Sequence, residues 1–278
     1  MLAPEAVAID RLEAFAEQAD YAIVGPIDNR IHEIATTRFP LSTVCHVERD
    51  FGDGRWRGCT GVLIGPRSVL TAAHCLYNLI LRRAPARIRV SPGRRDRDTR
   101  PFGVVNAVAA YVPRHFRDGG QPRQAYDYGL ARLATTVRGI RGFMPLEAAS
   151  DEDLLQVRRR GLITIAGYPS DRPAGSMWRH SEKLKRWTPR RLFYSVDTCP
   201  GHSGSPIWTG PAARPRIIGI HTSGIVDERG RPYGCNRDTI VAPPGMVNSG
   251  VRVIQEMIGN VQAPERPGIG RRLMVRVM

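Results

Sequence analysis

A histidine, an aspartate and a serine stand in three short segments whose residue types suit nucleophilic catalysis: His74, Asp127 and Ser203. A serine hydroxyl is a weak nucleophile until a base takes its proton. An imidazole is such a base near neutral pH, and a carboxylate fixes the tautomer of that imidazole and stabilises the imidazolium. Together the three side chains predict acyl transfer from a substrate carbonyl to Ser203.

The predicted nucleophile lies in a glycine-rich run, residues 201–206, with Gly201 before it and Gly204 directly after it. Glycine adopts backbone conformations that other residues resist. Such a loop is expected to aim successive backbone N–H groups into one concave spot, which is what an oxyanion hole requires.

Each segment taken alone has a plainer interpretation. A Gly-Xaa-Ser-Gly sequence is usually only a turn, a lone histidine is usually a core residue, and a lone aspartate usually caps a strand. The combination carries more weight, because the order histidine, aspartate, serine matches one known arrangement of a catalytic triad.

The elements that must position these residues are short strands. Runs rich in Val, Ile and Thr alternate with Gly, Pro, Asp and Arg, which predicts an all-β protein built as a barrel or sandwich. The expected strands are residues 42–47, 59–64, 87–90, 104–108, 162–166, 207–209, 217–222 and 239–242.

Helices are expected at the two ends of the chain, over residues 1–21 and 248–258. A break near residues 147–153 divides the chain between the two terminal segments into two halves. The expected organisation is a propeptide helix over 1–22, one barrel over 23–150, a second barrel with its helix over 151–260, and a loose basic tail over 261–278.

The composition excludes several classes of protein. Hydrophobic residues make up 42% of the 278 residues, enough for a sizeable core, and no apolar run is long enough to span a bilayer. The net charge of +15 suggests nucleic acid, but all the basic residues except Lys183 and Lys185 are arginine and no nucleic-acid-binding motif accompanies them. Nucleic acid is therefore an unlikely partner, and neither a membrane nor a cofactor nor a metal ion is expected.

Five cysteines favour two disulfides and one spare thiol, although five reduced, buried cysteines remain an alternative. Disulfides indicate an oxidising compartment, so the expected location is secreted or periplasmic. No secretory signal is recognisable over residues 1–21, which has neither a basic start nor an apolar block.

The catalytic segments resemble the histidine and serine boxes of trypsin-like (chymotrypsin-fold) serine peptidases. Residues 71–75 read Thr-Ala-Ala-His-Cys and residues 201–206 read Gly-His-Ser-Gly-Ser-Pro, while residues 127–130, Asp-Tyr-Gly-Leu, resemble the aspartate box. Within this family, residues 59–66 and 219–222 are most similar to the corresponding segments of bacterial glutamyl endopeptidases. The resemblance covers residues 23–259.

The resemblance implies two antiparallel six-stranded β-barrels and a C-terminal helix. His74 and Asp127 would come from the first barrel and Ser203 from the second, with the N–H groups of Gly201 and Ser203 as the oxyanion hole. It also implies two disulfides, Cys59 with Cys75 and Cys199 with Cys235, and leaves Cys45 as a buried free thiol.

The resemblance leaves the primary specificity open. Asp197 matches the position where trypsins bind Arg or Lys, whereas Thr198 and His221 match the pair with which glutamyl endopeptidases bind Glu. An ionised aspartate in the same pocket would repel a Glu carboxylate. Glu is the favoured choice, Arg/Lys specificity and a catalytically inactive basic binding domain are the alternatives, and the pocket wall is completed by Thr222, Ser223 and Gly224.

One departure from the trypsin pattern concerns activation. The residue before the nucleophile, an aspartate in trypsin-like digestive enzymes, is His202 here, so the familiar activation salt bridge is not expected. Residues 1–22 are instead expected to be a propeptide removed near Ala22–Ile23, and a permanent N-terminal helix packed on the barrel is the alternative. The substrate is expected to be a polypeptide.

Overall fold

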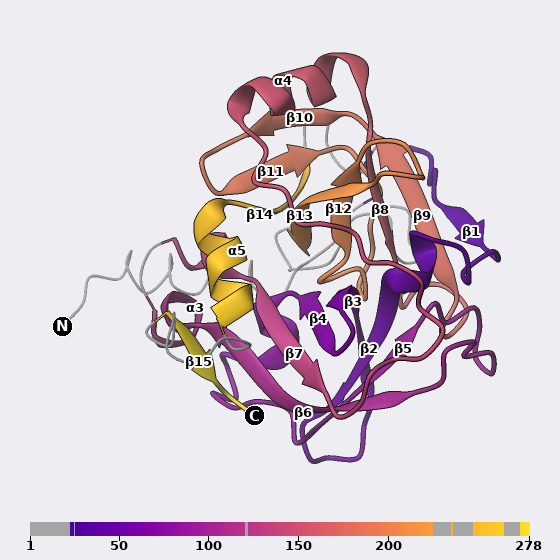
Figure 1. Cartoon of the computed structure of the whole chain (residues 1–278), viewed down its shortest axis with the longest axis vertical. Coiled ribbons are helices and arrows are strands. Elements are labelled where there is room, and N and C mark those ends of the chain that lie inside the picture. Colours follow the sequence, from indigo (N-terminus) through magenta and orange to yellow (C-terminus); the bar gives the residue numbers. More distant parts are fainter. Residues whose placement is uncertain (1–22, 25, 120–121, 225–234, 236–246, 264–272) are drawn as a thin grey trace.

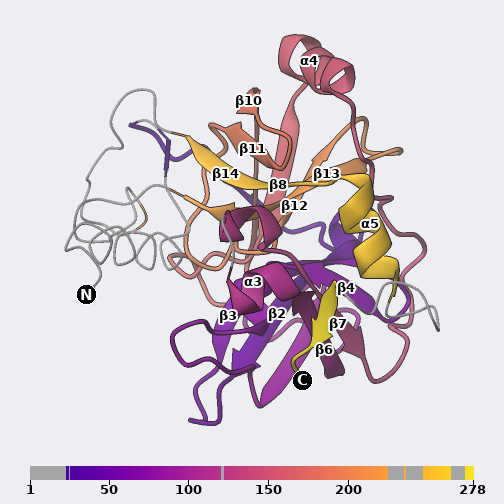
Figure 2. The ribbon, with the colours of Figure 1, turned by 90° about the vertical axis from the view of Figure 1, so that its left-hand side faces the viewer.

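A computed structural model of the chain describes residues 23–24, 26–119, 122–224, 235, 247–263 and 273–278. The helix expected over residues 1–21 and the strand expected over 239–242 lie outside the described residues. Two antiparallel β-structures make up the described part, one below the other in Figures 1 and 2, and the C-terminal helix lies where they meet.

The first half of the chain forms a closed six-stranded antiparallel barrel. Its strand order is β6-β5-β2-β3-β4-β7, and a further pairing between β6 and β7 closes it. The strands bury almost every inward side chain, which explains their high content of Val, Ile, Leu and Ala. They are β2 (Val44–Asp50), β3 (Arg57–Gly65), β4 (Ser68–Thr71), β5 (Arg87–Pro92), β6 (Val105–Pro113) and β7 (Gly129–Leu133).

Among the described residues, the second antiparallel sheet has eight strands where six were expected, and most of these strands come from the second half of the chain. Its order is β1-β9-β8-β12-β13-β14-β11-β10. The strand β1 (Ile31–Glu33), which was expected to belong to the first barrel, pairs with β9. The others are β8 (Ile163–Gly167), β9 (Met177–Glu182), β10 (Leu184–Trp187), β11 (Arg191–Tyr194), β12 (Pro206–Thr209), β13 (Arg216–Ser223) and β14 (Asn248–Arg252).

Short helices fill the connections. The longest described helix is α4 (Asp151–Arg160), where Ser150 and Asp153 form a reciprocal capping box at the expected break between the halves. No described helix is long and apolar enough to cross a membrane. The remaining helical elements are η1 (Leu41–Thr43), α2 (Ala73–Leu76), α3 (Arg114–Asp118), η2 (Arg123–Tyr126) and α5 (Gln255–Gln262).

The prediction of a helix over residues 248–258 was wrong for its first half. Residues 248–252 are the strand β14, which pairs with β11 on one side and β13 on the other, and the helix α5 begins only at Gln255. A local capping signal at Asn248 or Ser249 is weaker than backbone hydrogen bonds to two neighbouring strands, because tertiary context overrides helix propensity.

The C-terminal tail is not loose throughout. The strand β15 (Met274–Arg276) pairs antiparallel with β6 of the first barrel, and the backbone N–H of Arg114 donates to the Leu273 carbonyl at 2.8 Å. The C-terminal end of the chain therefore packs on the barrel that is formed by the N-terminal half.

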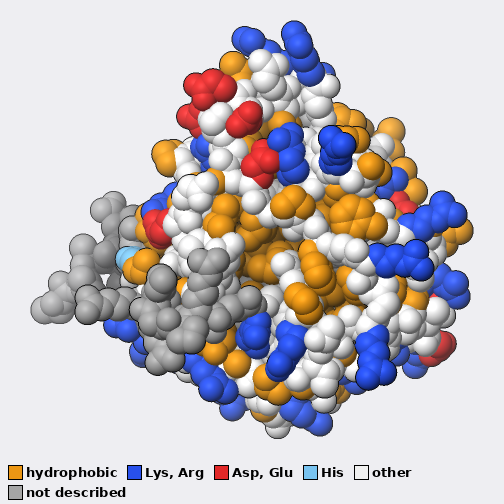
Figure 3. Space-filling model, in the orientation of Figure 1, with side chains coloured by type: hydrophobic (Ala, Val, Ile, Leu, Met, Phe, Trp, Pro, Cys, Tyr) orange, Lys and Arg blue, Asp and Glu red, His pale blue; other side chains and the backbone are white. Residues whose placement is uncertain are grey.

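A hydrophobic cluster joins the two halves. Val44, Val62 and Leu70 of the first barrel pack together with Ile217 and Ile220 of the second sheet. Figure 3 shows hydrophobic side chains gathered near the middle of one face, with Lys and Arg around them. The shared cluster holds the barrel and the second sheet in one arrangement, and that fixes the site between them.

The expected covalent framework is confirmed. Cys59 is bonded to Cys75, Cys199 is bonded to Cys235, and Cys45 is a buried free thiol. The arginine-rich stretch 82–100 also has a structural use, because Arg89, Arg94 and Arg100 surround Glu48 on the first barrel.

Candidate active site

The pairing of two strands places His74 beside Asp127. Thr71 at the end of β4 lies opposite Gly129 at the start of β7. His74 follows Thr71 on the short helix α2, and Asp127 precedes Gly129 directly after η2. The two side chains therefore emerge at the same end of the barrel.

Asp127 holds His74 through two hydrogen bonds. Its Oδ2 lies 2.7 Å from the imidazole Nδ1, and its Oδ1 accepts the backbone N–H of His74 at 3.0 Å. Asp127 as a whole residue is only 7% exposed. This geometry places the proton of the neutral imidazole on Nδ1 and leaves Nε2 as the basic nitrogen, which is the tautomer that a general base needs.

The serine loop of the second half packs onto the segment that leads to His74. The backbone N–H of Thr60 donates to the Ser203 carbonyl at 2.8 Å. Gly204, at φ +83°, lies so close that an added Cβ would be 2.1 Å from the Thr71 Oγ1 and 2.8 Å from the Ala72 nitrogen. Only glycine fits there, so the contact between the loops depends on the Ser-Gly pair.

Two backbone hydrogen bonds fix the orientation of the predicted oxyanion hole. The Pro200 carbonyl accepts from the N–H of Ser170 at 2.6 Å, and the His202 carbonyl accepts from the N–H of Ser205 at 2.8 Å. In a trans peptide the carbonyl and the following N–H point in opposite directions. The N–H groups of Gly201 and Ser203 are thus turned away from these partners.

The side chain of His202 is buried and forms a hydrogen bond within the serine loop. Its Nδ1 accepts the backbone N–H of Cys199 at 3.0 Å, and the ring is 1% exposed. Burial holds the pKa of His202 well below its usual range, and the positive charge of Arg30 adds to this effect. A neutral His202 braces the loop, and it cannot replace an activation carboxylate.

The residues expected to line the primary pocket surround the serine loop. The backbone N–H of His221 donates to the Ser205 carbonyl at 2.9 Å, and the His221 carbonyl accepts from the N–H of Gly204 at 2.8 Å. The side chains of Thr198, His221 and Thr222 are fully buried, whereas Ser223 and Gly224 are partly exposed at the end of β13. Among the described residues, the buried Thr198 Oγ1 has no hydrogen-bond partner.

Asp197 is turned toward the N-terminal segment. Its Oδ1 accepts the backbone N–H of Val24 and its Oδ2 that of Asn29, both at 2.8 Å. The Nδ1 of His180 accepts the backbone N–H of Asp197 at 2.8 Å. Burial raises the pKa of Asp197 although both amide donors oppose the shift. Both carboxylate oxygens are therefore engaged by the chain itself.

Sequence reasoning missed several residues that support this region. The Tyr194 hydroxyl lies 2.6 Å from Nδ1 of His221, and the Asn260 side chain donates to the Tyr128 hydroxyl at 2.7 Å beside Asp127. Arg191 links the two halves by donating to the Gln124 carbonyl at 2.8 Å. A cavity of about 500 Å³ is lined in part by Arg191 and Gln124 and by Ser223 and Gly224.

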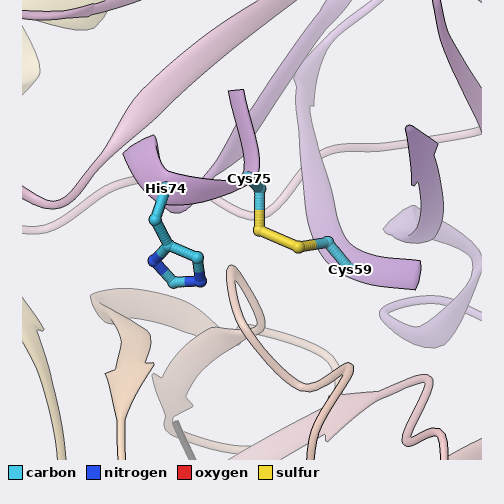
Figure 4. Close-up of side chains that lie close together, drawn as sticks. All are labelled: Cys59, His74 and Cys75. Carbon is cyan, nitrogen blue, oxygen red and sulfur yellow. A yellow bond between two sulfur atoms is a disulfide. The ribbon is translucent and has the colours of Figure 1, made fainter. Parts of the chain in front are cut away.

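The sulfur and nitrogen atoms of Cys59, His74 and Cys75 lie within 4.8 Å of one another, as metal ligands do. Figure 4 shows the two sulfurs bonded to each other, with the His74 ring extending from α2 toward the pale ribbons of the second sheet. A thiolate is the metal ligand that cysteine offers, and a disulfide has none. The cluster is therefore a disulfide beside an imidazole.

Comparison with known proteins agrees with this arrangement. The trypsin domain model matches residues 30–241. A glutamyl endopeptidase of Bacillus licheniformis is 29% identical over 251 residues, which cover 88% of this chain and 70% of the relative. An extracellular metalloprotease of Bacillus subtilis is 28% identical over 251 residues, covering 87% and 69%.

The solved structures show the same fold. A Glu endopeptidase in complex with MPD superimposes with a TM-score of 0.70 at 24% identity, covering 88% of this chain and 99% of that one. Since the trypsin domain match takes in far more than half of the sequence, the chain belongs to the trypsin family, and it is a serine endopeptidase.

Proposed function

We propose that Ser203, His74 and Asp127 are the catalytic triad and that the protein cleaves polypeptides through an acyl-enzyme on Ser203. The observation that carries this proposal is the seating of Gly204 against Thr71 and Ala72, directly before the histidine that Asp127 holds. The nucleophile and its base thus come from the second sheet and the barrel, which pack against each other.

The chemistry follows from these groups. The Ser203 Oγ attacks the carbonyl carbon before the scissile bond, and its proton passes to Nε2 of His74. The negative charge on the carbonyl oxygen is met by the N–H groups of Gly201 and Ser203. The amine leaves with the proton from His74, and water then hydrolyses the ester by the same steps. Asp127 keeps both hydrogen bonds to His74 and stabilises the imidazolium.

Glu is the proposed residue before the cleaved bond. The buried Thr198 hydroxyl and the buried imidazole of His221 are suited to donate hydrogen bonds to a carboxylate. The engagement of both Asp197 oxygens by Val24 and Asn29 argues against a pocket of the trypsin type. The relatives named glutamyl endopeptidase support the same choice.

Secretion with removal of residues 1–22 completes the proposal. Two disulfides favour an oxidising location. Ile23 is 4% exposed and packs with the Cys199–Cys235 disulfide. A chain that begins at Ile23 would carry its new amine one residue from Val24, whose N–H donates to Asp197 next to Thr198.

The cleavage profile of a mixed peptide library tests activity and specificity together. We expect cleavage after Glu, slower cleavage after Asp, and none by the Ser203→Ala variant. Cleavage after Arg or Lys that disappears in Asp197→Ser would replace this specificity with the trypsin type. Absence of any cleavage, with no labelling of Ser203 by a sulfonylating inhibitor, would favour a binding domain without activity.

A further inference from the structure

A buried arginine lies between the N-terminal segment and the loop that precedes β9. The side chain of Arg30 has no exposed surface, and each of its three nitrogens donates to a carboxylate. We propose that Arg30 is a positioning residue for the oxyanion hole, because through Asp171 it holds the turn that fixes the Pro200–Gly201 peptide. The inference rests on the proposed function, in which the N–H of Gly201 is half of that hole.

Arg30 binds two aspartates that belong to different segments of the chain. Its Nε and Nη2 donate to Asp28 at 2.9 and 2.7 Å, within the N-terminal segment. Its Nη1 and Nη2 donate to the two oxygens of Asp171 at 3.0 and 2.6 Å, in the loop between β8 and β9. Paired bonds between planar groups fix direction as well as distance. Arg172, beside Asp171, also donates to Asp28, so the loop is tied to this segment at two successive residues.

The segment that carries Arg30 is itself anchored on both sides. Before Arg30, the backbone N–H groups of Val24 and Asn29 each donate to Asp197 at 2.8 Å. After it, β1 begins at Ile31 and pairs with β9, beside which it lies in Figure 1. The guanidinium therefore extends from a fixed backbone and sets the position of the carboxylate that it binds.

The turn held by Asp171 is in direct contact with the oxyanion loop. The neighbouring Ser170 donates its backbone N–H to the Pro200 carbonyl at 2.6 Å. A Cβ added to Gly201 would lie 2.2 Å from the Tyr168 carbonyl oxygen and 3.2 Å from the Ser170 nitrogen. Ser170 itself is exposed in a turn, so its direction depends on the residues beside it. Asp171 is one of these, and Arg30 holds it.

The orientation of the Pro200–Gly201 peptide matters for catalysis. Gly201 has a φ of +100° and no side chain, so its own sterics do little to stop this peptide from rotating. The Pro200 carbonyl and the Gly201 N–H point in opposite directions, so the bond from Ser170 to the carbonyl also aims the N–H. An oxyanion donor is effective only when it is already aimed at the developing charge. Arg30 accordingly acts on the transition state without touching the substrate.

An amide substrate and a trifluoromethyl ketone inhibitor, both built on the peptide that the library profile selects, test this link. The Ser203 Oγ adds to the ketone carbon, the ketone oxygen becomes an oxyanion, and the serine proton passes to His74, so the adduct requires the oxyanion hole. Arg30→Met leaves Asp28 and Asp171 without the cation between them. It should lower kcat per active site by about 10–100-fold, weaken the ketone by a similar factor and change KM little.

Two kinetic results would overturn the proposal. The active sites are counted by titration with a sulfonylating inhibitor. If Arg30→Met only reduces their number and each remaining site has the normal kcat, the arginine has a purely structural role. If KM rises while kcat is unchanged, the arginine acts on the substrate pocket instead of the oxyanion hole.

Two further variants complete the test. Asp171→Asn places an amide nitrogen against Arg30 but keeps the ion pair with Asp28, so it tests the link even if Arg30→Met does not fold. It should reproduce the lower kcat, and the double variant should be little worse than either single one. Arg252→Met is the matched control, because Arg252 is 8% exposed and pairs with Asp151 at the connection between the halves. It should keep its kcat, and an equal loss there would reduce the effect to general destabilisation.

A crystal structure of Arg30→Met gives a readout that needs no activity. The proposal requires that the hydrogen bond from Ser170 to Pro200 is broken and that the Gly201 N–H has turned. An unchanged peptide would overturn it. A rotated peptide in this variant, together with a wild-type enzyme that neither turns over the substrate nor binds the ketone, would support the link and count against the proposed function, so the two failures are distinguishable.

Discussion

Gly204, which directly follows the proposed nucleophile Ser203, has no space for a side-chain carbon atom. A Cβ on Gly204 would lie 2.1 Å from the Thr60 carbonyl oxygen, a backbone atom that cannot move aside alone. The positive φ adds strain for any other residue. The contact between the serine loop and the histidine segment is therefore intolerant of substitution.

We expect Gly204→Ala to lower kcat/KM by at least 100-fold, because the loop that carries Ser203 must move away from the histidine segment. Gly54→Ala is the control, since Gly54 also has a positive φ (+74°) but nothing lies within 4 Å of its Cβ position. That variant should lose only about 1 kcal/mol of stability and keep its activity. Peptide hydrolysis and urea unfolding of both variants would check this, and near-normal turnover by Gly204→Ala would contradict it.

The triad proposal makes a prediction about additivity. Ser203→Ala and His74→Ala should each remove most of the activity, and the double variant should be little worse than either, because the residues act as a unit. Asp127→Asn should lose about 10⁴-fold in kcat, since an amide favours the wrong imidazole tautomer. Steady-state kinetics decide the matter, and multiplicative losses in the double variant would speak against a shared mechanism.

At the scale of elements, strand β2 carries a histidine whose charge the fold does not accommodate. Burial lowers the pKa of His46 to about 3, and its Nδ1 lies 2.7 Å from the Arg94 guanidinium. Between that value and the unfolded value near 6.5, only the unfolded chain binds the proton. Stability contributed by His46 is thus complete above pH 6.5 and is lost as the pH falls.

We expect the free energy of unfolding, measured in urea on the Ser203→Ala protein, to fall between pH 6.5 and pH 5. His46 contributes at most about 1.4 kcal/mol per pH unit, and His202 acts in the same direction. His46→Gln keeps an acceptor for Arg94 and should reduce this slope. His115→Gln, at an exposed position, should not change it. An unchanged slope in His46→Gln would count against the assigned protonation state.

The elements also show what sequence reasoning reaches and where it stops. The disulfides and the all-β class were confirmed because local runs and family resemblance encode them. The strand at Asn248 was mistaken for a helix because its partners β11 and β13 are distant in sequence. Tyr194 gave no local signal for the same reason, since His221 lies 27 positions away.

At the scale of the molecule, the proposed removal of residues 1–22 is testable by N-terminal sequencing. Active enzyme should begin at Ile23, whose burial against the Cys199–Cys235 disulfide brings the new terminus near Asp197. Full-length Ser203→Ala protein serves as the uncleaved reference. Full activity of a chain that still starts at Met1 would defeat the proposal.

Each sheet has one edge strand that comes from the opposite half of the chain. The early strand β1 joins the later sheet through β9, whereas the late strand β15 joins the early barrel through β6. A cut in the connection between the halves, for example after Glu147 by a second molecule of a Glu-specific enzyme, would therefore not let the pieces drift apart. Each piece would keep one strand paired with the sheet of the other, so a nicked molecule would stay assembled. Autolysis at this place would therefore break one peptide bond without separating the two halves.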